Sequence, residues 1–223
     1  MSIAACGSNG GGGEDLTSLR IKMVNEQIAE RGVVDTSVLR AMRIVPRHEF
    51  VPADSRNSAY ADYPLSIGHD QTISQPYIVA YMTEALAVKK GHKILEIGTG
   101  SGYQAAVLAQ MGADVYSIEI VEPLGVKARE VLTKLGYKVH LKIGDGYEGW
   151  PAAAPFDGII VTAAPKKIPA PLVDQLKEGG RLVIPVGSFF QDLKVFKKMG
   201  GKLKKETTLP VRFVPMTGKA DAR

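Results

Sequence analysis

The feature that most constrains the fold of this chain is an alternation of short apolar runs and helical patterns that begins at Lys93. Each run is too short for a helix and is followed by a longer stretch with helical spacing. This order is typical of a parallel sheet with helices on both faces. We therefore predict an α/β chain with a Rossmann-like, doubly wound and mostly parallel sheet. The expected strands are 93–97, 114–118, 138–143, 156–161 and 181–186, and the expected helices are 103–111, 122–135 and 169–177.

The 223 residues are enough for one large domain. We treat 15–223 as a single unit and predict that a glycine-rich tail before it is disordered, because the tail has little to bury. The predicted segments are the tail (1–14), a helical and loop region on the substrate side (15–90), a cofactor-binding core (91–187), and an antiparallel hairpin with a closing strand at 211–215 (188–223).

Local signals in the first ninety residues place two helices and a long loop. Gly32 is placed to end a first helix, and Asp35 is expected to be the N-cap of a second helix that stops before Pro46. Residues 46–73 show no sustained period. A stretch of that length with little regular structure is usually functional inside a compact domain.

Composition limits the classes of function. Apolar residues make up 45% and charged residues 23% of the chain, as in soluble globular proteins, and no apolar run approaches the roughly 18–20 residues of a membrane helix. The net charge of +5 owes much to six lysines between Lys194 and Lys205. No aromatic interleaving or nucleic-acid motif accompanies them, so we interpret them as solvated charges on an edge hairpin.

Metal and disulfide chemistry find little support in the sequence. Cys6 is the single cysteine, which excludes an internal disulfide and a cysteine-based metal site and fits a reducing cytoplasm. No spacing of His, Asp or Glu suggests a metal site.

A glycine-rich loop follows the first predicted strand, in the order Glu96-Ile-Gly98-Thr-Gly100-Ser-Gly102. Glycines here let the backbone approach a ligand closely, and the next helix offers its N-terminus. A tight turn alone would also explain them. The spacing differs from the G-x-G-x-x-G of dinucleotide folds. A carboxylate at Glu96 would repel a pyrophosphate and suits a cationic group, such as the amino group of a methionine moiety; bracing of the loop is the alternative.

Two further acids follow the next predicted strands. Glu119 ends the second strand, where an acid can accept hydrogen bonds from both ribose hydroxyls. Asp145 follows the third strand, between two glycines. Carboxyl ends of parallel strands meet at one edge of an open α/β sheet, so we expect these acids to share a site with Glu96. Three acids without a basic residue favour an adenosine that carries no phosphate, which points to S-adenosylmethionine.

Several motifs outside the glycine loop are more specific. They are Val45-Pro-Arg-His-Glu-Phe-Val-Pro52, Ala59-Tyr-Ala-Asp-Tyr-Pro-Leu65, Ile67-Gly68 with Gln71-Thr-Ile-Ser-Gln-Pro76, Gly180-Arg-Leu-Val-Ile-Pro-Val-Gly187 and Val211-Arg-Phe-Val-Pro-Met-Thr217. From about residue 20 onward, the chain resembles the protein-L-isoaspartate (D-aspartate) O-methyltransferase family. It departs from the glycine- and aromatic-containing family variants at His69-Asp70.

The resemblance implies an activity and a set of site residues. The activity is methyl transfer from S-adenosylmethionine, which becomes S-adenosylhomocysteine, to the free carboxylate of L-isoaspartyl and D-aspartyl residues in damaged proteins; repair then proceeds through a succinimide. Ser74 is the implied catalytic residue, although a serine before Pro76 also fits a helix N-cap, and both roles can coexist. The implied cofactor-binding residues are Thr72, Glu96, Gly98, Thr99, Gly100, Glu119, Asp145, Gly146 and Thr217, and the implied substrate-binding residues are Ile73, Ser74, Gln75 and Val214.

This chemistry requires few catalytic groups. An α-carboxyl group has a pKa of about 3.3–3.7 and needs no general base at pH 7, so the enzyme mainly aligns the reacting atoms and excludes water. None of His48, His69, His92 and His140 clusters with a nucleophile and an acid in the sequence. His48, in the long early loop, is left with two interpretations: it lines the substrate cleft, or it is structural.

We expect a cytoplasmic monomer that acts on isoaspartyl-containing proteins and peptides and requires no nucleic acid, membrane or metal. Two alternatives share the cofactor fold: another methyltransferase with an RNA or small-molecule substrate, and a non-catalytic adenosine-binding or scaffold protein. A nicotinamide dehydrogenase is less favoured because of the glycine spacing.

Overall fold

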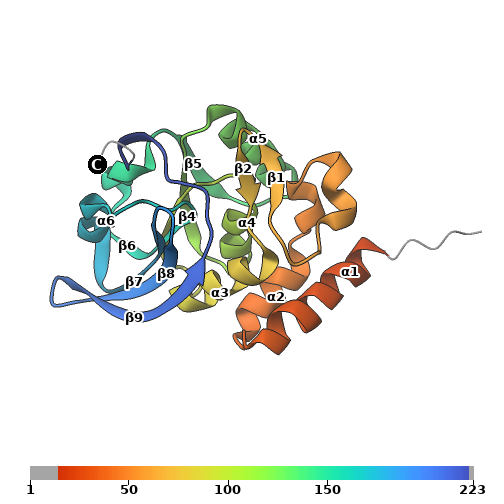
Figure 1. Ribbon diagram of the computed structural model, residues 1–223, viewed down its shortest axis with the longest axis horizontal. Helices are drawn as coiled ribbons and strands as arrows, with labels where there is room; N and C mark the ends of the chain where they lie inside the picture. The colour runs from red at the N-terminus through yellow and green to blue at the C-terminus, as the bar shows by residue number, and fades with distance from the viewer. Residues whose placement is uncertain (1–14, 221–223) are drawn as a thin grey trace, which may run out of the picture.

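A seven-stranded sheet forms the centre of the computed structural model, which describes residues 15–220; the predicted tail, 1–14, lies outside the described residues (Figure 1). The strand order is β5-β4-β3-β6-β7-β8-β9. The first five of these strands run parallel, and β8 and β9 are antiparallel. This confirms the predicted fold class. The strands are β3 (Lys93–Ile97), β4 (Asp114–Glu119), β5 (Val139–Ile143), β6 (Phe156–Val161), β7 (Leu176–Gly187), β8 (Gln191–Met199) and β9 (Lys202–Val211).

Two apolar clusters flank the sheet, because successive side chains of a strand point to opposite faces. Ile94 of β3 packs in the cluster that holds the buried residues of the N-terminal helices, α3 and α4, whereas its neighbour Leu95 packs with Leu172 of α6 on the other face. Both faces are therefore covered, as a parallel sheet requires. The helices named here are α3 (Pro76–Leu86), α4 (Tyr103–Gln110) and α6 (Ala170–Gln175); α5 (Glu122–Lys134) lies between α4 and α6 in the chain.

The N-terminal helices begin and end near the predicted residues. Helix α1 (Leu16–Lys22) continues through a π-helical segment and a 3-10 turn to Gly32, whose φ of 94° ends the helical run. Helix α2 (Thr36–Ile44) starts after Asp35, whose side chain accepts hydrogen bonds from the backbone N–H groups of Ser37 and Val38. The predicted N-cap is thus confirmed.

The long early loop consists of short elements. Two 3-10 helices, Arg47–Phe50 and Ala53–Ser58, precede a hairpin of β1 (Leu65–Gly68) and β2 (Gln71–Ile73). His69 and Asp70 form the turn of this hairpin with φ values of 54° and 56°. A two-residue turn of this kind needs positive φ at both positions. Asp and His adopt such φ values more often than most residues do, and glycine adopts them without strain.

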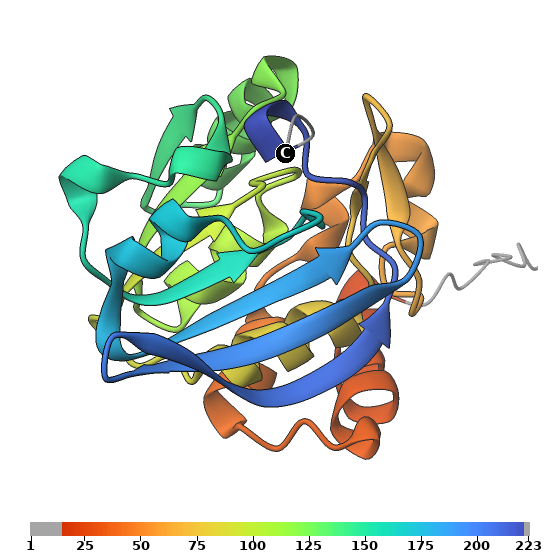
Figure 2. The ribbon, with the colours of Figure 1, turned by 60° about the vertical axis from the view of Figure 1, so that its left-hand side comes forward.

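The end of the chain differs from the prediction. The hairpin at Gly200-Gly201 is present, but β9 stops at Val211, so the prediction of a closing strand at 211–215 is wrong. Residues 212–217, here called the strap, follow β9 (Figure 2). Pro215 of the strap forms an isolated bridge with Ala164, which lies in the loop after β6. The Gln191 side chain takes the place of a neighbouring strand, because its amide accepts from the N–H of Phe213 at 2.6 Å and donates to the Phe213 carbonyl at 3.1 Å. The helix predicted over 169–177 also ends early, at Gln175, where β7 follows at once.

Candidate active site

A pocket opens at the carboxyl edge of the sheet, between the ends of β3, β4 and β6. β3 has β4 on one side and β6 on the other, so this is the point where the strand order reverses and where open α/β sheets bind ligands. The space between the lining atoms is about 860 Å³, including the part open to solvent. The predicted site residues that line it are Thr72, Ile73, Ser74, Gly98, Thr99, Gly100, Glu119, Gly146, Val214 and Thr217.

Two glycines form the pocket floor at positions where a side chain would clash. Gly98 has a φ of 94°, and a Cβ there would lie 2.5 Å from the Thr162 hydroxyl, which itself donates to the Gly98 carbonyl at 2.6 Å. A Cβ on Gly146 would lie 2.3 Å from Ile97 Cγ2. Both positions therefore require glycine, because a side chain would have to displace Thr162 or Ile97, which also line the pocket.

Glu119 combines burial with unused hydrogen-bonding capacity. Its side chain ends β4 and is 5% exposed. Oε2 accepts from the Gly100 N–H at 2.7 Å, and Oε1 accepts from the Val121 N–H at 2.9 Å. A carboxylate offers about four acceptor positions, so about two remain for donors in the pocket. This geometry fits a pair of ribose hydroxyls.

Glu96 lies beneath the glycine loop and is fully buried. Its Oε2 accepts from the Ser117 hydroxyl, which in turn lies 2.6 Å from Thr99 Oγ1. Oε1 is buried without a partner among the described residues. Burial raises the pKa of Glu96 to about 8, so the carboxyl group is mainly protonated at pH 7. The contacts make Glu96 a support of the loop. That it also binds the cofactor stays a prediction.

The buried carboxyl group gives a testable pH dependence. A carboxyl whose pKa is higher in the folded state stabilises the fold fully below its unfolded pKa, and this contribution is lost as the pH rises toward the folded value of about 8. In the wild type, the free energy of unfolding should therefore fall with rising pH, by at most about 1.4 kcal/mol per pH unit from this group. We expect Glu96→Gln to remove this fall. Urea unfolding of the ligand-free protein at pH 6 and pH 8.5 measures it, with exposed Glu122→Gln as the control. Parallel pH profiles for the wild type and Glu96→Gln would contradict the assignment.

Asp145 does not line the pocket but holds its rim. Oδ1 accepts from the Tyr147 N–H at 2.9 Å, and Oδ2 accepts from the Lys219 N–H at 2.8 Å. The second bond joins the turn after β5 to the 3-10 turn Gly218–Ala220, which directly follows the strap. Asp145 therefore fixes both Gly146 and the far end of the strap.

Ser74 lies on the opposite wall of the pocket and is half-buried. Helix α3 begins at Pro76 with Gln75 as its N-cap residue and without a side-chain cap hydrogen bond in the described chain. The interpretation of Ser74 as an N-cap is therefore wrong, because the helix starts one residue later than that role requires. Its hydroxyl has no hydrogen-bond partner within residues 15–220. It is free to bind a ligand.

A buried arginine holds the Ser74 backbone from behind. The Arg47 side chain is fully buried; its Nη2 donates to the Ser74 carbonyl at 2.7 Å and its Nε to the Ala59 carbonyl at 2.8 Å. The guanidinium lies 4.9 Å from the centre of the Tyr103 ring. Burial lowers the pKa of Arg47 to about 10, so the group still carries its charge at pH 7.

Gln75, a predicted substrate residue, is directed elsewhere. Its Nε2 donates to Asp62 Oδ2 at 2.7 Å, and Asp62 Oδ1 accepts from the Tyr77 N–H at 3.2 Å. These bonds fix the start of α3 to the loop before β1. Gln75 is not part of the pocket lining described for residues 15–220.

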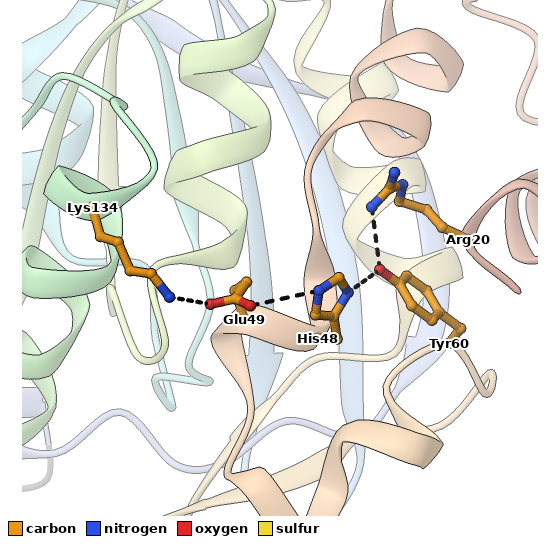
Figure 3. A network of polar contacts seen from close by, with 5 residues as sticks. All are labelled: Arg20, His48, Glu49, Tyr60 and Lys134. Carbon is orange, nitrogen blue, oxygen red and sulfur yellow. Dashed lines mark hydrogen bonds and ion pairs between the residues drawn. The ribbon is translucent and has the colours of Figure 1, made fainter. Parts of the chain in front are cut away.

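His48 belongs to a polar network away from the pocket (Figure 3). Its Nδ1 lies 2.6 Å from the Tyr60 hydroxyl and its Nε2 lies 3.6 Å from Glu49, which pairs with Lys134 of α5 at 2.7 Å. Arg20 of α1 donates to the same Tyr60 hydroxyl at 3.5 Å. Burial lowers the pKa of His48. These contacts support the structural interpretation of His48, in which it links the early loop to α1 and α5.

Several residues that line the pocket are not predicted by the sequence. Thr162 and Ala163 directly follow β6, and the rule that placed the acids at strand ends would have found them if it had been applied to the fourth strand. Arg47, which supports the site from outside the pocket lining, lies inside a recognised motif, but nothing in its spacing indicates a buried group. The other lining residues that were missed are Gln71, Val79, Met82, Ile97, Ser101, Tyr103, Gln104, Ile118, Ile120, Val121, Pro215 and Met216.

Comparison with known proteins finds one family whose members match most of the chain. Residues 19–221 match the family described as Protein-L-isoaspartate(D-aspartate) O-methyltransferase. A protein-L-isoaspartate O-methyltransferase of Opitutus terrae is 60% identical over 204 residues, which cover 90% of this chain and 88% of that protein. One of Gloeobacter violaceus is 57% identical over 198 residues, covering 87% and 97%.

Solved structures agree with this family match. A protein-L-isoaspartate O-methyltransferase superposes with a TM-score of 0.82 at 31% identity, covering 92% of this chain and 67% of that one. A Plasmodium falciparum protein assigned to the same activity, in complex with S-adenosyl-L-homocysteine, gives a TM-score of 0.77 at 27% identity and covers 89% and 98%.

Proposed function

The chain belongs to the protein-L-isoaspartate (D-aspartate) O-methyltransferase family, and we propose that the pocket at the carboxyl edge of its sheet is where it carries out the family's reaction. The enzyme transfers a methyl group from S-adenosylmethionine to the free carboxylate of L-isoaspartyl and D-aspartyl residues in damaged proteins and peptides. The neighbouring backbone amide nitrogen then attacks the methyl ester, methanol leaves, and the succinimide that results starts repair. The observation that carries the assignment is that the glycine loop, Glu119 and Ser74 converge on one cavity.

The cofactor half of the pocket is the side formed by the ends of β3 and β4. Glu119 offers its remaining acceptor positions to the ribose hydroxyls, and Gly98 and Gly146, which line the pocket, lie against the adenosine. Thr99 and Gly100 of the glycine loop complete this half in our proposal, and Glu96 and Asp145 shape it from outside. Thr72 of β2 and Thr217 of the strap bind the cofactor from the facing side of the pocket, where the two halves meet. When bound, S-adenosylmethionine supplies a methyl group already activated by its sulfonium, so a carboxylate can accept it without a proton transfer.

The substrate half lies between β2 and the strap. The Ser74 hydroxyl, which has no protein partner in the described residues, donates a hydrogen bond to the substrate carboxylate and holds it facing the methyl group. Ile73 and Val214 line the same region and exclude water, and Gln75 acts by fixing the start of α3. Because the carboxylate is ionised at pH 7, the residues here orient it and need not deprotonate it.

We further propose that the enzyme works as a monomer in the cytoplasm. A single cysteine permits no internal disulfide, which fits a reducing compartment. Within residues 15–220, no helix has the length and apolar character needed to cross a membrane.

The proposed function is tested by transfer of labelled methyl from S-adenosylmethionine to two peptides that differ only in aspartyl or isoaspartyl linkage at one position. We expect label on the isoaspartyl peptide alone, released as methanol by mild base. Label on neither peptide, with cofactor binding confirmed by calorimetry, would favour an RNA or small-molecule substrate or a scaffold role.

Ser74→Ala is expected to lower kcat/KM for an isoaspartyl peptide about 10- to 100-fold, because a hydrogen bond to a charged group is worth about 1.5–3 kcal/mol. The affinity for S-adenosylmethionine should stay within about 2-fold, since a hydrogen bond made to the substrate does not act on the cofactor. Peptide kinetics and calorimetry measure the two effects, with the exposed Ser37→Ala as the control. Unchanged kinetics in the Ser74 variant would remove this residue from the site.

A further inference from the structure

The turn between β7 and β8 exposes two adjacent aromatic side chains. Phe189 and Phe190 are 92% and 88% exposed, and their ring centres lie 5.5 Å apart in an edge-to-face arrangement. Burial of a phenylalanine side chain is favourable. Two adjacent phenylalanines exposed to solvent at one turn are therefore unusual. Single exposed apolar residues need no explanation, whereas contiguous ones mark interaction sites.

The turn lies at the same edge of the sheet as the pocket. β7 runs parallel to β6 and β3, so its last residue, Gly187, reaches the edge where the pocket opens. The turn and the strap lie side by side, as Figure 2 shows for the light-blue turn and the blue segment after β9. The lysine-rich end of the β8–β9 hairpin is at the opposite edge and is remote from this surface.

Both ends of the turn are tied to segments that line the pocket. The Gly187 N–H donates to the Pro165 carbonyl at 3.0 Å, just after Thr162 and Ala163 of the pocket wall. Gln191 holds Phe213 of the strap through both atoms of its amide. The backbone of the turn also packs closely against Gly187, because a Cβ at this position would lie 2.0 Å from the Phe190 carbonyl oxygen. The turn is therefore a fixed extension of the pocket rim.

We propose that Phe189 and Phe190 form a docking surface for apolar side chains of the substrate polypeptide, within a few residues of the isoaspartyl residue. The inference rests on the proposed function, whose substrate is a peptide segment longer than the pocket can hold. Segments that place a damaged residue in the pocket must extend across the rim. Two aromatic rings bind aliphatic or aromatic side chains without reading a particular sequence, which suits an enzyme that accepts many proteins.

The test compares two isoaspartyl peptides of equal length, one flanked by leucine and phenylalanine and one by serine and glutamine. For the wild type we expect a KM about 5- to 20-fold lower for the apolar-flanked peptide. In F189S/F190S that advantage should disappear, with kcat, the KM for the polar-flanked peptide and the affinity for S-adenosylmethionine unchanged. Val34→Ser, at another exposed apolar side chain, 76% exposed, is the control.

Three outcomes would overturn the proposal. One is an unchanged KM of F189S/F190S for the apolar-flanked peptide, and another is an equal rise in KM for both peptides. The third is a wild-type dimer that the double variant converts to monomer with no change in KM, which would make the turn a contact between two copies of the chain. Methylation of neither peptide by the wild type would overturn the proposed function itself.

Discussion

Replacing Glu119 by alanine is expected to weaken binding of S-adenosylmethionine about 100-fold. In the proposed complex the carboxylate accepts two ribose hydroxyls, and each hydrogen bond to a charged group is worth about 1.5 kcal/mol or more. Loss of both is about 3 kcal/mol, a little over two powers of ten in the dissociation constant. The variant also removes the acceptor for the Gly100 and Val121 N–H groups, so the glycine loop loses one of its hydrogen bonds to β4, while those from Gly98 and Thr99 to Ile118 remain.

Glu119→Gln and Glu122→Ala sharpen this test. Glutamine keeps one acceptor oxygen but loses the charge, so we expect an intermediate loss of about 10-fold. Glu122 is an exposed acid in the first turn of α5, and its loss should leave the affinity unchanged. Calorimetry gives the dissociation constants, and circular dichroism shows whether the variants are folded. A folded Glu119→Ala protein that binds the cofactor as tightly as Glu122→Ala would exclude the ribose assignment.

The sequence was sufficient to predict the sheet and its ligand-binding edge. The alternation after Lys93 specifies parallel strands with crossover helices, and such sheets bind ligands where the strand order reverses. The position of Glu119 at this edge could be predicted because Glu119 ends its strand. The glycine loop could also be predicted, for a different reason. Gly98 adopts a φ of 94°, which few residues other than glycine adopt.

Residues whose position depends on tertiary contacts could not be predicted in this way. Glu96 lies only two residues before Gly98, yet it points beneath the loop, toward Ser117 of the neighbouring strand. The sequence does not show this direction. The sequence predicts a strand over 211–215, whereas Gln191, more than twenty residues earlier in the chain, satisfies the Phe213 backbone through its side chain. The role of Arg47 could not be predicted from the sequence, because its side chain donates hydrogen bonds to backbone carbonyl groups, which every residue carries.

Arg47→Met is expected to destabilise the folded protein. It would leave the buried carbonyl groups of Ala59 and Ser74 without their arginine donors, and an unsatisfied buried polar group costs about 1–3 kcal/mol. We expect the free energy of unfolding to fall by about 3 kcal/mol, as measured by urea denaturation. Arg47→Lys keeps the charge but cannot bridge both carbonyls, so it should be less destabilised and remain suitable for kinetics.

Arg47 is also expected to affect catalysis, because it holds the backbone of Ser74. It touches the backbone of Ser74 and does not line the pocket in the described chain, so it is a positioning residue that acts through Ser74. At a temperature where the variant is folded, Arg47→Lys should lower kcat about 10-fold or more, while the affinity for S-adenosylmethionine stays within about 3-fold. A small misplacement of a positioning group is sufficient for a loss of this size. Arg56→Lys, on the exposed neighbouring 3-10 helix, is the matched control.

A double-mutant cycle with Ser74→Ala separates positioning from a general structural role. If Arg47 acts by placing Ser74, its replacement should cost little further activity once the Ser74 hydroxyl is gone, and the two effects will not add. If Arg47 only stabilises the fold, the loss caused by Arg47→Lys will be the same in both backgrounds. Additive losses in kcat would therefore refute the positioning role while leaving the stability prediction intact. The buried cation would then be a structural support of the long early loop, whose carbonyl groups it would still hold in place.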